Sequence, residues 1–309
     1  MRIAIVGAGG IGCIYGAALA KAGADVTFIA RGAHLAAMQA NGLRIEGDRG
    51  ETVLGKVQAT DDPASVGTVD YAIFCVKLWD VESAGTAIKP MVGPETAVIP
   101  QQNGVDAHER LIPILGREAV MGGTAWVTGS IVAPGVVRQT GTYQKLIFGE
   151  LDGVLSARGQ ALAEMCAAAG FDGEFEPNVL VPIWEKFLSI IPLSSVNSLT
   201  RAPLGVYRED AELWALCENA LRETIAVGRA EGIALPADAF DKVCGQMRSM
   251  PPYHMTSMCN DLLRGNRIEL PWFAGKVVEL GKKHGVPTPT CNLLYAALKP
   301  HVNGKAGVI

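Results

Sequence analysis

The sequence predicts an α/β protein whose N-terminal half forms a parallel sheet and whose C-terminal half forms an all-helical domain. Three observations favour this fold class. The chain begins with a short apolar strand that runs directly into a glycine-rich turn. Strand and helix patterns then alternate through the first half, as in parallel sheets covered by helices on both faces. From about residue 154 onward only helical patterns recur, and 309 residues suit two domains.

The first half contains short apolar segments separated by amphipathic ones. We predict sheet strands at 2–6, 25–30, 70–76 and 96–100, and helices at 11–22, 33–41, 80–91 and 105–116. Residues 43–60 have the pattern of a hairpin-like insertion. Further strand-like segments lie at 119–128, 135–140 and 144–149.

The second half has apolar residues at the three- and four-residue spacing of helices. We predict helices at 154–169, 178–191, 207–231, 236–248, 266–284 and 290–298. Residues 171–177 are expected to connect the domains. We therefore predict a dinucleotide-binding domain at 1–176 and a helical substrate and dimerisation domain at 177–309.

Composition excludes several classes of protein. The chain has 27 Lys+Arg and 31 Asp+Glu, a net charge of −4, so we expect no nucleic-acid partner. No apolar run approaches the roughly 18 residues of a membrane span, and we expect no membrane association. Seven scattered cysteines without a CxxC pair favour a reducing cytoplasm and argue against a zinc site or any other metal. The N-terminus lacks the pattern of a signal peptide.

The turn after the first strand has the spacing GxGxxG, formed by Gly7, Gly9 and Gly12 with Gly10 and Ile11 between them. Because it follows a strand and opens a helix, it predicts a Rossmann-type site for a dinucleotide. Gly7 permits the tight turn, Gly9 lets the backbone approach a pyrophosphate, and Gly12 allows close packing of helix and strand. The alternative is a chance cluster of glycines.

The end of the second strand indicates which dinucleotide binds. An NAD site usually has Asp or Glu there, whereas this strand is followed by Arg31, and Asp25 lies too early. A guanidinium can hold a ribose 2′-phosphate through two hydrogen bonds, so we predict NADP(H). The alternative is a solvated arginine beside an NAD site.

Seven short blocks occur in an order that resembles a known family. They are MRIAIVGAGGIG at the N-terminus, IAR (29–31), VKLWD (76–80), PQQNGV (100–105), WEKF (184–187), TSM (256–258) and RIEL (267–270). This series resembles the ketopantoate reductase (2-dehydropantoate 2-reductase) family over essentially the whole chain. The resemblance implies a Rossmann domain, a helical domain and an active site in the cleft between them. It also implies NADPH-dependent reduction of a 2-oxo acid to a 2-hydroxy acid, as in pantothenate biosynthesis, and a possible homodimer.

The resemblance also implies roles for individual residues. Lys186 would donate the proton, with Asn103 and Glu269 completing the catalytic set. Lys77 and Asn103 would border both nicotinamide and substrate, and Glu269 would bind the cofactor ribose. Ser257 would hold the substrate carboxylate. These types suit the chemistry, because hydride delivery leaves negative charge on a ketone oxygen that a protonated lysine can neutralise.

Each of these residues also has a structural interpretation. Lys186 could be a solvated lysine on a helix, and Glu269 a surface charge. Asn103 could be the left-handed residue of an Asn-Gly turn, a role compatible with a functional one.

The sequence departs from the family where asparagines often follow the catalytic lysine at four and eight residues. Ile190 and Ser194 occupy these positions, and Leu204 stands where a later asparagine is common. We expect Pro192 to kink the helix between them. Ser194 keeps a hydroxyl and is expected to contact substrate, but the apolar replacements favour a larger or more apolar substrate than ketopantoate.

Three functions therefore remain open. The first is an NADPH-dependent 2-oxo acid reductase with ketopantoate as nominal substrate. The second is a reductase or dehydrogenase of the same fold acting on another carbonyl, alcohol or imine. The third is a non-enzymatic NADP(H) sensor, which would need neither Lys186 nor Glu269.

Overall fold

The computed structural model describes residues 1–305 and divides into two compact units, Met1–Ile183 and Trp184–Ile309. The division falls within helix α6 (Leu180–Thr200). The expected boundary between residues 176 and 177 stays a prediction.

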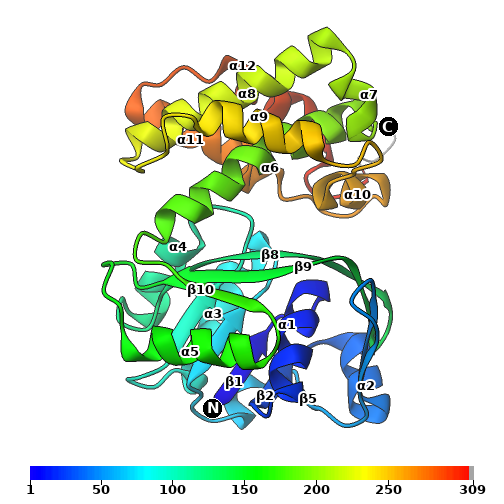
Figure 1. The fold of residues 1–309 in the computed structure, drawn as a ribbon, viewed down its shortest axis with the longest axis vertical. Helices are drawn as coiled ribbons and strands as arrows, with labels where there is room; N and C mark the ends of the chain where they lie inside the picture. The colour runs from blue at the N-terminus through cyan, green and yellow to red at the C-terminus, as the bar shows by residue number, and fades with distance from the viewer. Residues whose placement is uncertain (306–309) are drawn as a thin grey trace. The chain divides into compact units, whose positions relative to one another are not determined.

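The first unit is built on a parallel sheet, which confirms the predicted fold class (Figure 1). Its strand order is β5-β2-β1-β6-β7, and every neighbouring pair is parallel. The strands are β1 (Arg2–Val6), β2 (Asp25–Ile29), β5 (Gln58–Thr60), β6 (Tyr71–Phe74) and β7 (Ala97–Pro100). The strand order reverses direction at β1, which is where ligands bind in sheets of this kind.

Both faces of this sheet are buried, because side chains alternate along each strand. Ile3 and Ile5 belong to one core and Ala4 and Val6 to another. The helices of this half are α1 (Gly10–Lys21), α2 (Gly32–Asn41), α3 (Val81–Ala87) and α4 (Ala107–Leu115). Helix α1 packs on the Ile3 face, and α3 and α4 contribute to the core on the Ala4 face.

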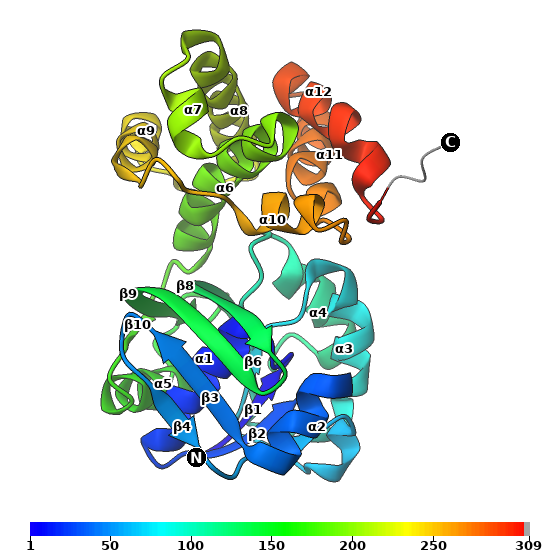
Figure 2. The ribbon, with the colours of Figure 1, turned by 90° about the vertical axis from the view of Figure 1, so that its right-hand side faces the viewer.

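A second sheet covers the outer side of α1, as Figure 2 shows. Its path is β10-β9-β3-β4, with β8 paired to β9. The strands are β3 (Leu43–Gly47), β4 (Thr52–Leu54), β8 (Gly122–Ala133), β9 (Val136–Gly149) and β10 (Asp172–Phe175). The predicted hairpin is confirmed for β3 and β4, which pair antiparallel.

Two predictions about this region are wrong. The segments 135–140 and 144–149 are one continuous strand, β9. Residues 171–177 are not merely a connection, because β10 pairs in parallel with β9. Helix α5 (Ala157–Ala168) packs on β10, so the run of helical pattern after residue 154 begins inside the first unit.

The second unit is helical, as predicted. Besides α6, it contains α7 (Leu204–Arg208), α8 (Ala211–Ala230), α9 (Ala239–Ser249), α10 (Ser257–Leu263), α11 (Ala274–His284) and α12 (Pro289–Leu298). Helix α6 continues through Pro192 to Thr200, so the proline does not end it. The predicted helix at 207–231 is divided into α7 and α8. No helix in the described part of the chain is long and apolar enough to cross a membrane.

Candidate active site

The glycine turn after β1 has the geometry that its sequence requires. Gly7 has φ +90°, a conformation that side chains disfavour, and its N–H donates to the Ile29 carbonyl at 3.2 Å. A Cβ on Gly12 would lie 2.5 Å from the Gly7 carbonyl oxygen, so only glycine lets α1 pack this closely. A Cβ on Gly10 would lie 2.4 Å from the carbonyl oxygen of Gly129 in β8, so Gly10 also serves packing between sheet and helix.

Gly9 differs from the other glycines of the turn. An added Cβ would meet no atom of the described chain within 4 Å. The space in front of Gly9 is therefore open, and the first turn of α1, with Gly10 and Ile11, begins immediately after it. Free N–H groups at a helix N-terminus attract phosphate. This open cradle fits the pyrophosphate of a nicotinamide dinucleotide.

The other predicted cofactor residues follow neighbouring strands of the same sheet. Arg31 follows β2, Lys77 follows β6, and Asn103 follows β7. The last residues of these strands are paired: Val6 with Ile29 and Phe74, and Phe74 with Pro100. The structure thus brings the glycine turn, Arg31, Lys77 and Asn103 to one edge of the sheet, at the carboxyl ends of its strands.

Gln102 holds the Asn103 loop against the Lys77 segment, a role that sequence reasoning missed. Its buried amide nitrogen donates to the carbonyl oxygens of Phe74 and Val76, each at 3.0 Å. Lys77 itself is half-buried, with Nζ 5.5 Å from the centroid of the Trp79 ring.

Asn103 is half-buried and does not adopt the left-handed conformation of an Asn-Gly turn. Among residues 1–305, Arg201 is the non-glycine residue with positive φ, at +55°. The conformational explanation for Asn103 is therefore wrong.

Arg31 lies at the surface of the first unit. Its side chain is 75% exposed, and its Nη2 lies 3.5 Å from Oδ2 of Asp80. Asp80 ends a short 3₁₀ turn (Leu78–Asp80) and immediately precedes α3. The sequence does not predict this pair, because 49 residues separate its members.

In the second unit, Lys186 lies in the first half of α6 and is half-buried. Burial lowers its pKa to about 8, and the negative charge of Glu269 acts in the opposite direction. Lys186 is therefore mostly protonated at neutral pH but can release its proton. The interpretation of Lys186 as an ordinary solvated lysine does not fit this environment.

Glu269 is 6% exposed, so it is not a surface charge. It immediately precedes a 3₁₀ turn, Leu270–Trp272. Its segment is tied to the C-terminal region by the Ile268 N–H, which donates to the Val302 carbonyl at 3.0 Å. A buried carboxylate needs a cation or hydrogen bonds in its surroundings, and the charge of Lys186 meets part of that need.

Ser257 is exposed at the start of α10, where the preceding Thr256 caps the helix by accepting from the Cys259 N–H at 3.3 Å. Asn197, fully buried on α6, fixes this point. Its Oδ1 accepts from the Thr256 N–H at 2.7 Å and its Nδ2 donates to the Ala202 carbonyl at 2.5 Å. Sequence reasoning missed Asn197, although it lies eleven residues after Lys186 and thus near the same face of the helix.

The three departures from the family pattern differ in their surroundings. Because α6 is continuous, Ile190 and Ser194 share a face with Lys186. Ile190 is half-buried and Ser194 is 4% exposed. Leu204 is fully buried in the helical unit, so it serves packing.

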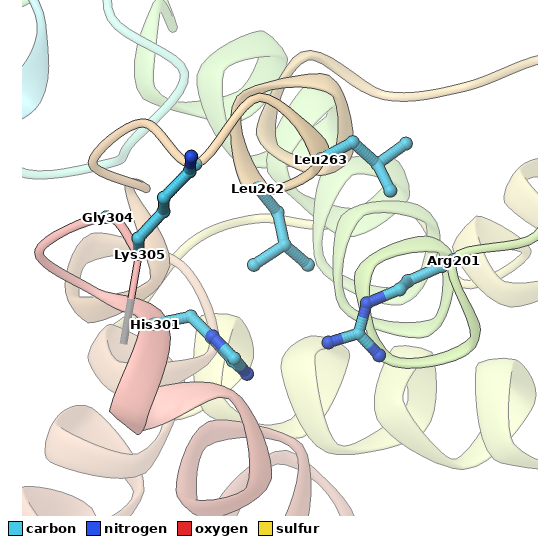
Figure 3. Close-up of a pocket in the computed structure, with 7 residues that line it drawn as sticks. Arg201, Leu262, Leu263, His301, Gly304 and Lys305 are labelled. Atoms are coloured by element: carbon cyan, nitrogen blue, oxygen red, sulfur yellow. The ribbon is translucent and has the colours of Figure 1, made fainter. Parts of the chain in front are cut away.

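A separate pocket of about 260 Å³ lies in the second unit (Figure 3). It is lined by Arg201, Leu262, Leu263, Gly265, His301, Gly304 and Lys305. None of the predicted catalytic or substrate residues lines it.

A parallel-sheet unit with a Rossmann-type glycine turn, followed by a helical unit, is the architecture of a class of oxidoreductases. The family model described as ketopantoate reductase PanE/ApbA matches residues 3–153, and the model for the C-terminal part of that family matches residues 178–302. The chain belongs to the ketopantoate reductase family.

Individual relatives agree with this assignment. A 2-dehydropantoate 2-reductase of Mesorhizobium japonicum is 31% identical, over 97% of both chains. The crystal structure of a PanE/ApbA family ketopantoate reductase from Ralstonia eutropha JMP134 has a TM-score of 0.90 and 33% identity, covering 97% of this chain and 98% of that one. A D-mandelate dehydrogenase solved with NADH and anilino(oxo)acetate shares the fold, with a TM-score of 0.89 at 22% identity and coverage of 97% and 98%.

Proposed function

We propose that the protein reduces a 2-oxo acid to a 2-hydroxy acid with NADPH, nominally 2-dehydropantoate to pantoate, and that Lys186 donates the proton. The observation that carries this proposal is the environment of Lys186. Its pKa of about 8 keeps the ammonium charged at neutral pH and ready to lose its proton, and Glu269 supports the charge. A general acid is most effective when its pKa lies near the working pH.

In this proposal each residue has one task. The bound cofactor supplies the hydride. Lys186 stabilises the negative charge that develops on the carbonyl oxygen and then transfers its proton to that oxygen. Ser257 hydrogen-bonds the substrate carboxylate, and the exposed hydroxyl at the start of α10 supports that role. Lys77 and Asn103 orient nicotinamide and substrate, with Ser194 as a further substrate contact. Glu269 orients Lys186 and the cofactor ribose.

The choice of NADP(H) over NAD(H) rests on Arg31. A guanidinium at the end of β2 suits a 2′-phosphate, and its 75% exposure leaves donors available for one. The open space at Gly9 accommodates the pyrophosphate of either cofactor. By analogy with the family, we also propose a cytoplasmic homodimer.

A second candidate is a reductase for a larger, more apolar 2-oxo acid. Ile190 favours it, because an isoleucine one turn beyond Lys186 offers no partner to the hydroxyl of ketopantoate. The D-mandelate dehydrogenase that shares the fold was solved with a 2-oxo acid carrying an aromatic group.

The test is NADPH oxidation by the purified protein with ketopantoate and with 2-oxo acids bearing larger alkyl or aryl groups. A ketopantoate kcat/KM at least as high as that of the bulkier acids supports the first candidate. A higher value for the bulkier acids, with no ketopantoate rate, selects the second. If none of these 2-oxo acids supports oxidation of NADPH, both candidate functions are wrong.

A further inference from the structure

Asp80 directs its carboxylate at the group that we propose to bind the 2′-phosphate. Its Oδ2 lies 3.5 Å from Nη2 of Arg31, and the Asp80 side chain is 32% exposed. Both residues belong to the first unit and lie at the same edge of the parallel sheet, after β6 and β2 respectively. Any phosphate held by Arg31 would therefore lie near a negative charge.

Local structure gives Asp80 no other evident task. It occupies the N-cap position of α3, yet its side chain makes no capping hydrogen bond. Its local hydrogen bonds come from the backbone: the Asp80 N–H donates to the Lys77 carbonyl at 2.9 Å, and the Asp80 carbonyl accepts from the Ser83 hydroxyl at 3.1 Å. An aspartate at an N-cap normally turns to the helix, so its orientation toward Arg31 is informative.

The neighbouring carboxylate, Glu82, is committed elsewhere. Both of its oxygens accept from Arg110, with Nε–Oε1 and Nη2–Oε2 distances of 2.7 Å. This bidentate pair ties α3 to α4. Asp80 is thus the carboxylate of this segment that faces Arg31.

The pair has opposite consequences for the two cofactors. NADH lacks the 2′-phosphate, so it leaves the Arg31–Asp80 contact intact. NADPH must share the guanidinium with Asp80 and place its phosphate, which carries nearly two negative charges, close to the carboxylate. The single contact at 3.5 Å is too long and too exposed to order Arg31 strongly, so repulsion outweighs any benefit of ordering.

We infer that Asp80 is a selectivity residue that acts through Arg31 to weaken NADPH binding, so that the protein discriminates only modestly between NADPH and NADH. This inference rests on the proposed function, because it requires Arg31 to meet the 2′-phosphate. Coulomb repulsion of a phosphate by a carboxylate several ångströms away in water corresponds to about a three- to tenfold change in Kd at ordinary salt.

The experiment measures Kd for NADPH and NADH by nucleotide fluorescence with wild type, Asp80→Asn, Arg31→Ala and the double variant. Asp80→Asn should tighten NADPH by about three- to tenfold and change NADH by less than about twofold. Glu51→Gln is the matched control. It neutralises another exposed carboxylate of the first unit that pairs with an arginine, Arg44 at 2.5 Å, and should leave both Kd values unchanged.

The double variant separates this inference from the proposed cofactor site. In the Arg31→Ala background, Asp80→Asn should shift the NADPH/NADH ratio by less than about twofold, because without the guanidinium the 2′-phosphate is no longer held near Asp80. An unchanged or weakened NADPH affinity in Asp80→Asn overturns the inference, while selective loss of NADPH in Arg31→Ala still upholds the proposed site. Equal effects of Arg31→Ala on both cofactors overturn the proposed site itself.

Discussion

The carboxylate of Glu269 raises the pKa of Lys186 against a burial that lowers it to about 8. Lys186 lies on α6 and Glu269 lies 83 residues later, before a 3₁₀ turn of the same helical unit. Burial removes water from both charged groups, which is unfavourable for each of them. The opposite charges of Lys186 and Glu269 offset part of that cost. The pair gives the helical unit a partly buried lysine that is charged at neutral pH.

Replacing Lys186 with alanine should lower kcat by at least about a hundredfold, because both charge stabilisation and proton donation are lost. The Kd for NADPH should remain within about twofold, since the glycine turn and Arg31 are untouched. Lys242→Ala is the control, because Lys242 is an exposed lysine that pairs with Glu185 at 3.0 Å and should be silent. Unchanged turnover in Lys186→Ala would remove Lys186 as the acid.

The pH dependence of reduction should follow the pKa of Lys186. Because the protonated form is the active one, kcat/KM at saturating NADPH should be level below pH of about 8 and fall about tenfold per unit above it. Glu269→Gln removes a negative charge that favours the ammonium, so the pKa of Lys186 should fall and the alkaline limb should move to lower pH. If the alkaline limb of Glu269→Gln stays in place or moves to higher pH, Glu269 does not raise the pKa of Lys186.

Two glycine substitutions in one turn should have separate effects. Gly9→Ala places a methyl group in open space at φ −82°, so the unfolding temperature should stay unchanged while cofactor Kd rises by about tenfold or more. Gly12→Ala places a Cβ 2.5 Å from the Gly7 carbonyl oxygen, so it should cost about 1–3 kcal/mol of folding free energy. Titration with cofactor measures the Kd of each variant, and thermal denaturation measures its stability. Normal cofactor binding by Gly9→Ala would contradict a pyrophosphate at that position.

Asn197 should act as a positioning residue for Ser257. Asn197→Ala removes the acceptor for the Thr256 N–H and the donor to the Ala202 carbonyl, which should cost about 1–3 kcal/mol of folding free energy. At a temperature where the variant is folded, KM for the 2-oxo acid should rise more than kcat falls, because the carboxylate anchor is displaced. Asn292→Ala, at an exposed position of α12, is the control. Loss of stability with an unchanged KM would assign Asn197 a structural role alone.

Local features could be predicted from the sequence because their causes are local. The GxGxxG spacing predicted the turn, since Gly7 and Gly12 are required by backbone geometry within a few residues. The alternation of strands and helices predicted the parallel sheet. The two segments of β9 were predicted as strands, but their continuity and the second sheet were not, because the sheet pairs β3 with a strand some 90 residues later and no local pattern records such a partner.

The site divides in the same way. The sequence by itself determined which chemical groups are present: a glycine turn, a lysine in WEKF and a glutamate in RIEL. Only the tertiary structure decided their properties. Burial and the charge of Glu269 set the pKa of Lys186, Asp80 approaches Arg31 as an acidic neighbour, and Asn197 fixes the start of α10. These are effects of solvent exclusion and of short distances between residues far apart in the chain, and both exist only once the chain has folded.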